Sequence, residues 1–182
     1  MTDEVTLIHQ LKETKSKEAA FRELISQYKE RLYWHIRKIV ISHDDADDVL
    51  QNTFIKVFKN IETFKGDSKL YSWMYRIATN ESITFINKRA KDRKVAISEI
   101  HSELAATLQS DVYFSGDEIQ LILQKAIATL PTKQQLVFNM KYFDELKYSQ
   151  MSEILSTSVG ALKASYFHAV KKIEIYIQQN NN

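Results

Sequence analysis

The sequence of 182 residues contains no cysteine, one proline and three glycines. Without cysteine the chain can form neither a disulfide framework nor a thiolate metal site. Glycine and proline interrupt helices and build turns, so their scarcity favours long helices joined by short connections. The chain is still 44% hydrophobic, which is enough apolar material to form a core.

Other patterns are missing as well. The five histidines lie far apart, and no two of them have the four-residue spacing of a zinc-binding pair on a helix. No apolar run approaches the ~20 residues of a membrane helix. The acidic start of the chain, Met1 to Glu4, does not resemble a secretory signal. We therefore expect a cytoplasmic protein that inserts into no membrane and uses no metal, no other cofactor and no small-molecule substrate.

The formal net charge is only +2, but the charges are unevenly distributed. Residues 88–94 hold five basic side chains in seven positions. Residues 95–124 then carry five acidic and no lysine or arginine side chains, whereas seven lysines and four acids follow from Lys125 onward. This order predicts two cationic modules joined by an acidic connector.

The first module contains three helical patterns. Apolar residues in 21–39 and again in 46–61 recur at steps of three and four, which is the spacing of one helix face. Four aspartates between Asp44 and Asp48 favour a helix start there, because they complement the helix dipole. A loop around Gly66, with Ser68 as the expected N-cap, precedes a third helix predicted over 70–91. The third helix carries a polar stripe made of Arg76, Asn80, Thr84, Asn87, Lys88 and Lys91.

The remaining chain predicts a linker and a second module. Residues 95–117 lack clean periodicity and are interpreted as an acidic linker that could contain a short helical turn. Further on, a short helix over 148–155, a turn and a long helix after Ser158 form a helix-turn-helix pattern. In proteins that read DNA with this motif, the second helix enters the major groove. Its predicted inward residues are Val159, Leu162, Tyr166, Ala169 or Val170, Ile173 and Ile177, and its predicted outward residues are Ser158, Gly160, Ala161, Lys163, Ala164, Phe167, His168 and Lys171.

Three stretches in order resemble the extracytoplasmic-function subfamily of bacterial RNA polymerase sigma factors. They are DADDVLQNTFIKVF (45–58), FKGDSKLYSWMYRIATNESITFINKRAKDRK (64–94) and LPTKQQLVFNMKYFDELKYSQMSEILSTSVGALKASYFHAVKKIE (130–174). The resemblance implies an all-α fold with two small helical domains joined by a linker. Residues 1–94 would form the N-terminal domain, 95–117 the acidic linker and 118–182 the C-terminal helix-turn-helix domain.

The resemblance also implies roles for individual residues. Core RNA polymerase would bind Asp45, Asp48, Gln51 and Phe54. The promoter −10 element would be melted and bound by Phe64, Lys65, Gly66, Asp67, Ser68, Arg76, Asn80, Thr84, Asn87 and Lys88. The eight outward residues from Ser158 to Lys171 would read the −35 element, and an anti-sigma factor could be a further partner.

The chain departs from the family pattern at several positions. Thr84 stands where the family often has aspartate, Asn87 and Ser165 where it often has arginine, Phe167 where histidine is common, and Glu145 where glycine is frequent. These differences leave the fold expectation intact, and they prevent any prediction of the promoter sequence.

Several plainer interpretations stay open at this point. The aspartates at 44–48 could only cap a helix, and Phe64 could anchor its loop. Trp73 is better explained as core, and Phe167 could contact DNA or a partner. A stand-alone helix-turn-helix regulator, whose first module senses a ligand or dimerises, is the main alternative function. An enzyme is disfavoured, because the sequence has no nucleophile–base arrangement, no glycine-rich phosphate loop and no metal-ligand spacing.

Overall fold

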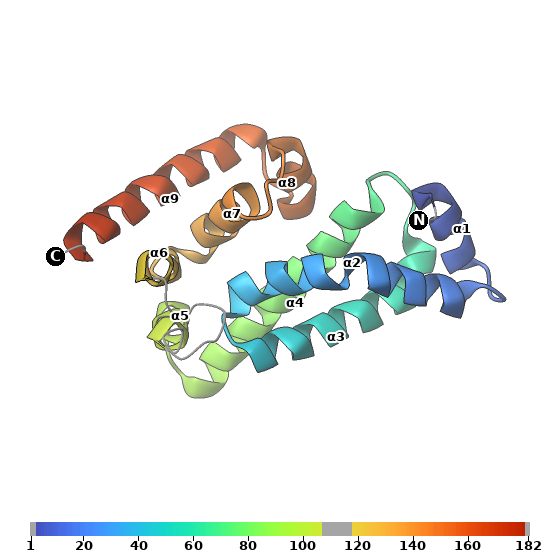
Figure 1. The fold of residues 1–182 in the computed structure, drawn as a ribbon, viewed down its shortest axis with the longest axis horizontal. Helices are drawn as coiled ribbons and strands as arrows, with labels where there is room; N and C mark the ends of the chain where they lie inside the picture. Colours follow the sequence, from blue (N-terminus) through green and yellow to red (C-terminus); the bar gives the residue numbers. More distant parts are fainter. Residues whose placement is uncertain (1–2, 107–117, 181–182) are drawn as a thin grey trace.

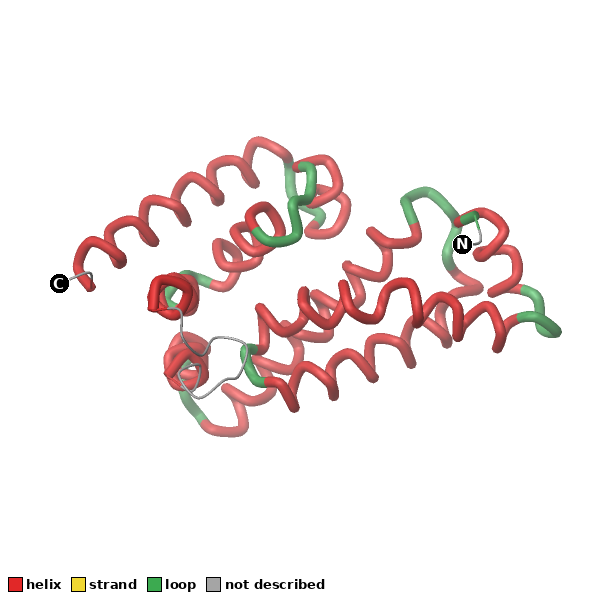
Figure 2. Tube along the Cα trace, viewed as in Figure 1, coloured by secondary structure: helices red, strands yellow, loops and turns green. Residues whose placement is uncertain are grey.

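The computed structural model describes residues 3–106 and 118–180, in which helices are the only regular secondary structure (Figure 2). This confirms the all-α prediction. In chain order (Figure 1) the elements are α1 (Glu4–Lys12), α2 (Lys17–Val40), α3 (His43–Asn60), the short 3-10 helix η1 (Ile61–Thr63), α4 (Leu70–Arg93), α5 (Ile97–Ala106), α6 (Glu118–Ala128), α7 (Thr132–Tyr142), α8 (Tyr148–Leu155) and α9 (Val159–Asn180).

In the N-terminal module α2, α3 and α4 lie lengthwise beside one another, and α1 lies at one end (Figure 1). Helix α3 begins where the aspartates predicted it, and the Ser42 hydroxyl accepts the Asp45 N–H at 3.4 Å. The start of α4 differs from the prediction, because Lys69 and not Ser68 is its N-cap. The Leu70 N–H is instead bound by the Glu4 carboxylate of α1, at 3.2 Å. A helix N-terminus is thus capped by a residue far away in the sequence.

Helix α5 corrects the linker prediction, which had allowed only a short helical turn over this stretch. The helix has ten residues and contacts both α4 and α6. It forms because Ile100 and His101 lie on the face that these helices cover, where both are at most 1% exposed. The part of the predicted linker from 107 to 117 lies outside the described residues.

The C-terminal module consists of α6 to α9. Helix α8 has the bounds that the sequence predicted and α9 begins where it was expected, and Ser156 turns the chain between them with a left-handed φ of 50°. On α9, Leu162, Ala169 and Ile173 are buried as expected. Val159 was predicted to face inward but is 38% exposed, because the first turn of the helix extends beyond the core.

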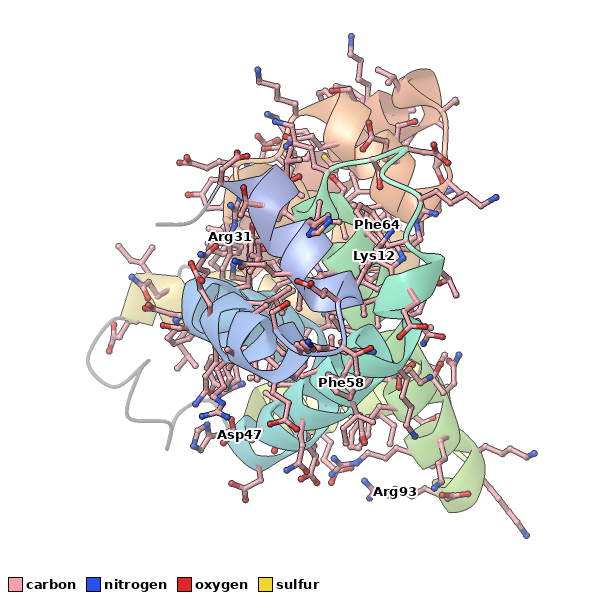
Figure 3. All side chains as sticks on the ribbon, turned by 90° about the vertical axis from the view of Figure 1, so that its right-hand side faces the viewer. Lys12, Arg31, Asp47, Phe58, Phe64 and Arg93 are labelled. Carbon is pink, nitrogen blue, oxygen red and sulfur yellow. The ribbon has the colours of Figure 1, made fainter. Side chains whose placement is uncertain are left out.

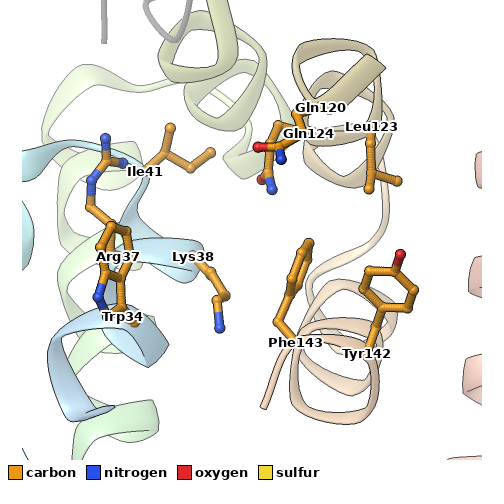
Figure 4. A pocket seen from close by; sticks show the side chains of 9 residues that line it. All are labelled: Trp34, Arg37, Lys38, Ile41, Gln120, Leu123, Gln124, Tyr142 and Phe143. Carbon is orange, nitrogen blue, oxygen red and sulfur yellow. The ribbon is translucent and has the colours of Figure 1, made fainter. Parts of the chain in front are cut away.

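The two modules pack directly against each other. Helix α8 lies on α4 and α7 lies on α2 (Figure 1). Val137, Met140, Met151 and Ile154 of the C-terminal module belong to the same buried apolar cluster as the core of the N-terminal module. A cavity of about 260 Å³ remains between α2 and the α6–α7 pair (Figure 4), and it is lined by Trp34, Arg37, Lys38, Ile41, Gln120, Leu123, Gln124, Tyr142 and Phe143.

Candidate polymerase and nucleic-acid interfaces

The four predicted polymerase-binding residues all lie on α3, but they are not equivalent. Asp48 and Gln51 are exposed. Asp45 forms an ion pair with Arg89 of α4, with 2.5 Å between Oδ2 and Nη1. Phe54 is only 8% exposed, and its ring meets that of Phe21 edge-on at 6.2 Å. Two of the four residues therefore face solvent, while the other two also hold the helices together.

Next to Gln51 the surface forms an apolar groove that the sequence prediction missed. Its volume is about 450 Å³, and its lining residues are Phe21, Ile25, Gln51, Phe54, Ile55, Phe58 and Lys59. Ile55 is 45% exposed on the otherwise polar side of α3. An isoleucine outside the apolar stripe of an amphipathic helix was the one feature of the sequence that could have indicated this groove.

The predicted −10 loop has a buried end and an exposed turn. Phe64 is 4% exposed and packs on Trp73 with 5.2 Å between ring centroids. Its carbonyl oxygen accepts a hydrogen bond from Lys12 of α1 at 2.6 Å, and both side chains are labelled in Figure 3. Lys65, Gly66 and Asp67 are exposed, and Gly66 turns the chain with a φ of 81°. Phe64 therefore acts as the loop anchor, and the turn is what a nucleotide can reach.

The polar stripe of α4 is formed as predicted. Its five proposed DNA-binding residues, Arg76, Asn80, Thr84, Asn87 and Lys88, are all exposed. The opposite face holds Met74, Ala78 and Ile86, which are at most 2% exposed. The stripe therefore offers amide, hydroxyl and cationic donors along one side of the helix, which suits both phosphates and base edges.

The two ends of this stripe have different surroundings. The Arg76 guanidinium donates a hydrogen bond to the Glu153 carbonyl of α8. Asn80 lines a cavity of about 570 Å³ whose opposite wall includes Thr132, Lys133, Ser156 and Thr157 of the C-terminal module. The beginning of the stripe thus faces the second module.

All eight residues that were predicted to read the −35 element are exposed, Ser158 directly before α9 and the other seven on it. The Ser158 hydroxyl accepts the Ala161 N–H at 3.3 Å and so caps the first turn. Nothing lies within 4 Å of a Cβ placed on Gly160, so the first turn is unobstructed on this side. Phe167 is 55% exposed, and the Lys171 ammonium lies over its ring at 4.9 Å. An apolar ring and a cation therefore lie together on the candidate DNA-binding face.

Two further properties of the described residues concern metal and membrane. Within 3–106 and 118–180, no group of three or more His, Asp or Glu side chains is arranged to hold a metal ion. None of the helices in these ranges is long and apolar enough to cross a membrane.

The same two modules are recognised by comparison with known families. A model of Sigma-70 region 2 matches residues 24–92, and a model of Sigma-70 region 4 matches residues 120–173. The ECF RNA polymerase sigma factor SigW of Bacillus subtilis (strain 168) is 33% identical over 82% of this chain and 84% of its own length. The chain belongs to the extracytoplasmic-function (ECF) family of RNA polymerase sigma factors. The resemblance inferred from the three stretches of sequence is thereby confirmed.

Other relatives and solved structures agree with this ECF assignment. The ECF RNA polymerase sigma-E factor of Escherichia coli (strain K12) is 26% identical, over 98% of this chain and 95% of its own. The structure of CnrH in complex with the cytosolic domain of CnrY has a TM-score of 0.71 at 19% identity and covers 97% of both chains. The sigma factor RpoE in complex with the anti-sigma factor NepR from Bartonella quintana has a TM-score of 0.67 at 17% identity, over 87% of this chain and 96% of its own. Both solved structures share the fold of this ECF sigma factor.

Proposed function

We propose that this ECF sigma factor binds core RNA polymerase and directs it to promoters through two DNA-binding surfaces. The loop before α4 and the polar stripe of α4 would bind the −10 element, and α9 would read the −35 element. The observation that carries the proposal is the exposure of every stripe residue on α4 and of every predicted outward residue on α9. The order of the region 2 and region 4 matches along the chain supports the same division.

Polymerase binding is assigned to α3 and the neighbouring groove. Protein interfaces combine a buried apolar centre with a polar rim. Phe58 and Ile55 supply apolar surface here, while Asp48 and Gln51 lie at the edge. Asp45 is better explained as a structural residue, because its carboxylate already pairs with Arg89.

Promoter opening is assigned to the loop and the stripe together. Removing a base from the stack costs a few kcal/mol, which contacts to the captured base must offset. Lys65 and Asp67 at the exposed turn and Asn80 on the stripe supply hydrogen-bonding groups on the single-strand side. Lysine and arginine contacts to phosphate would add affinity that falls with salt. Neither step needs covalent chemistry or a cofactor, so we assign the protein no enzymatic activity.

The domain boundaries at 1–94, 95–117 and 118–182 and the cytoplasmic location belong to the same proposal. An anti-sigma factor is a further proposed partner, as NepR is for RpoE of Bartonella quintana. A stand-alone helix-turn-helix regulator is not favoured. The first module matches Sigma-70 region 2, and a regulator of that kind would not need such a module.

In vitro transcription from a genomic DNA library tests the proposal. Core RNA polymerase of the cognate bacterium is used with and without this protein. We expect new transcripts whose start sites share two spaced upstream elements. If folded protein and active core enzyme give no new transcripts, the sigma-factor function is wrong for this chain.

A further inference from the structure

A single carboxylate of the C-terminal module lies between two side chains of the N-terminal module. Asp144, in the turn between α7 and α8, places Oδ2 2.9 Å from His35 Nδ1 and Oδ1 2.6 Å from Lys38 Nζ. The side chains of Asp144 and His35 are 5% and 1% exposed, and that of Lys38 is 17% exposed. A group this deeply buried is stable as an ion only with such partners.

The hydrogen bonds in this cluster stabilise the ionised form of Asp144. The Thr79 hydroxyl oxygen lies 2.8 Å from the Tyr75 carbonyl oxygen and 2.9 Å from His35 Nε2, so the far side of the His35 ring also has a polar partner. Burial by itself raises the pKa of Asp144, but the hydrogen bonds and positive charges of His35 and Lys38 outweigh burial and lower it. The ionised carboxylate therefore accepts from Nδ1 as well. Asp144 therefore lies between the His35 ring and the Lys38 ammonium, and each of them donates a hydrogen bond to one of its oxygens.

A second contact, made by the preceding helix α7, supports this arrangement. Asn139 of α7 donates its side-chain N–H to the Lys38 carbonyl at 3.2 Å. Lys38 is near the end of α2, where the last carbonyls have no partner within the helix. The Asp144 N–H in turn donates to the Asn139 carbonyl at 3.1 Å, which fixes the carboxylate beside α2. Main-chain and side-chain contacts thus join α7 to α2 at one point.

The packing that these contacts hold also places the C-terminal module beside the beginning of the α4 stripe. The Arg76 guanidinium is bound to the Glu153 carbonyl, and Asn80 faces Thr132 and Thr157 across a cavity of about 570 Å³. A strand that follows the stripe from Arg76 to Lys88 travels about 18 Å at 1.5 Å per residue. Its path near Asn80 would run into the C-terminal module, while Thr84, Asn87 and Lys88 stay open.

We propose that Asp144 is an intramolecular latch: by binding His35 and Lys38 it holds the two modules in a closed state, in which the C-terminal module lies in the path of a strand along the first half of the α4 stripe. The closed state must then open before a DNA strand can occupy the whole stripe. The latch itself rests only on the contacts of Asp144. Its regulatory meaning rests on the proposed −10 role of α4.

The absence of cysteine makes the test direct. Lys29→Cys on α2 and Lys172→Cys on α9 replace two exposed lysines and provide the only thiols for a donor–acceptor dye pair. Single-molecule energy transfer on the full chain then gives the ratio of open to closed molecules. Asp144→Asn keeps the shape of the side chain but removes its charge, and Lys38→Met removes the cation from the other side of the contact. Glu145→Gln is the matched control, because it neutralises the adjacent exposed acid.

We expect Asp144→Asn and Lys38→Met each to raise the ratio of open to closed molecules about tenfold or more, since each breaks a charged hydrogen bond. Glu145→Gln should leave the ratio unchanged. Unchanged ratios in both latch variants, or an equal rise in the control, would overturn the proposal. If Asp144→Asn lowers the helical circular dichroism, the variant has partly unfolded and its ratio is not used. The Lys38→Met ratio then tests the latch, because this substitution lies in the other module. If both latch variants raise the open fraction but neither they nor the wild type support transcription, the latch proposal is confirmed and the proposed promoter function is wrong.

Discussion

Asp45 of α3 and Arg89 of α4 form an ion pair that joins the candidate polymerase-binding helix to the basic end of the candidate −10 helix. Their side chains are 20% and 30% exposed, so water screens the pair only in part. An acidic residue that looked like polymerase-binding surface in the sequence therefore also stabilises the bundle.

The first prediction separates Asp45 from its neighbour Asp48. Asp48→Arg should weaken binding to core polymerase about tenfold at constant melting temperature, because an exposed charge is reversed at an interface rim. Asp45→Asn should instead lower the stability by about 1 kcal/mol through loss of the Arg89 pair. Fluorescence anisotropy with core enzyme and thermal melting measure the two effects. If Asp48→Arg melts the helix, the aspartates serve only the helix start.

The second prediction concerns the stripe of α4. Asn80→Ala should slow open-complex formation about tenfold while polymerase affinity stays the same, because the amide is assigned to the separated strand. Permanganate footprinting and polymerase binding give the two quantities. Asn60→Ala is the matched control, since Asn60 is exposed and its side chain donates to the Lys56 carbonyl of its own helix. Equal losses of both activities in Asn80→Ala would show that the −10 assignment is wrong.

The third prediction tests the turn that carries the latch. Glu145 has a left-handed φ of 53° where the family often has glycine. A residue with a Cβ is strained in this region, so Glu145→Gly should raise the stability by about 0.5–1 kcal/mol. Glu153→Gly, within α8, should lower it by about 1 kcal/mol, because glycine weakens helix interiors. Urea unfolding of both variants measures their free energies of unfolding. A lower stability of Glu145→Gly than of the wild type would show that Glu145 is not strained.

The fourth prediction is a pH dependence with a defined sign. The pKa of Asp144 is lowered below its usual 3.8 by His35 and Lys38. The stabilisation from its charge is therefore fully present above that value and is lost as the pH falls through the folded-state pKa. Asp144→Asn should be less stable by about 2–3 kcal/mol at pH 7, and the difference should shrink below pH 4. Urea unfolding at several pH values from 7 to 3 measures the stability of both proteins. If the difference between wild type and Asp144→Asn stays constant over this range, the charge of Asp144 does not contribute.

The fifth prediction uses the buried histidine of α5. Burial lowers the pKa of His101, so its ring is neutral in the fold and the unfolded chain binds more protons as the pH falls below 6.5. The protein should lose stability across this range. His101→Leu should remove that component and gain relative stability at pH 5. No change in the pH slope between wild type and variant would show that His101 is accessible to protons in the folded state.

Sequence periodicity predicted the amphipathic elements well, because their faces depend on local spacing. The bounds of α8, the start of α9 and the exposure of the α4 stripe follow from residues three and four apart. The contacts between distant residues could not be derived in this way. Glu4 capping Leu70, Asp45 pairing with Arg89 and Asp144 reaching His35 each depend on how helices meet. Phe64 was ambiguous for the same reason, since its burial requires Trp73 to lie beneath it.

The N-terminal helix has a practical consequence for handling this protein. Helix α1 touches the −10 loop from two sides, through Glu4 at the start of α4 and Lys12 at the Phe64 carbonyl. A fusion partner or truncation that displaces α1 would remove both contacts at once, and we expect the effect to resemble that of a promoter-melting mutant. Affinity tags for the assays above therefore belong after α9, because the C-terminal end of this helix lies far from the loop (Figure 1) and its last turn is exposed.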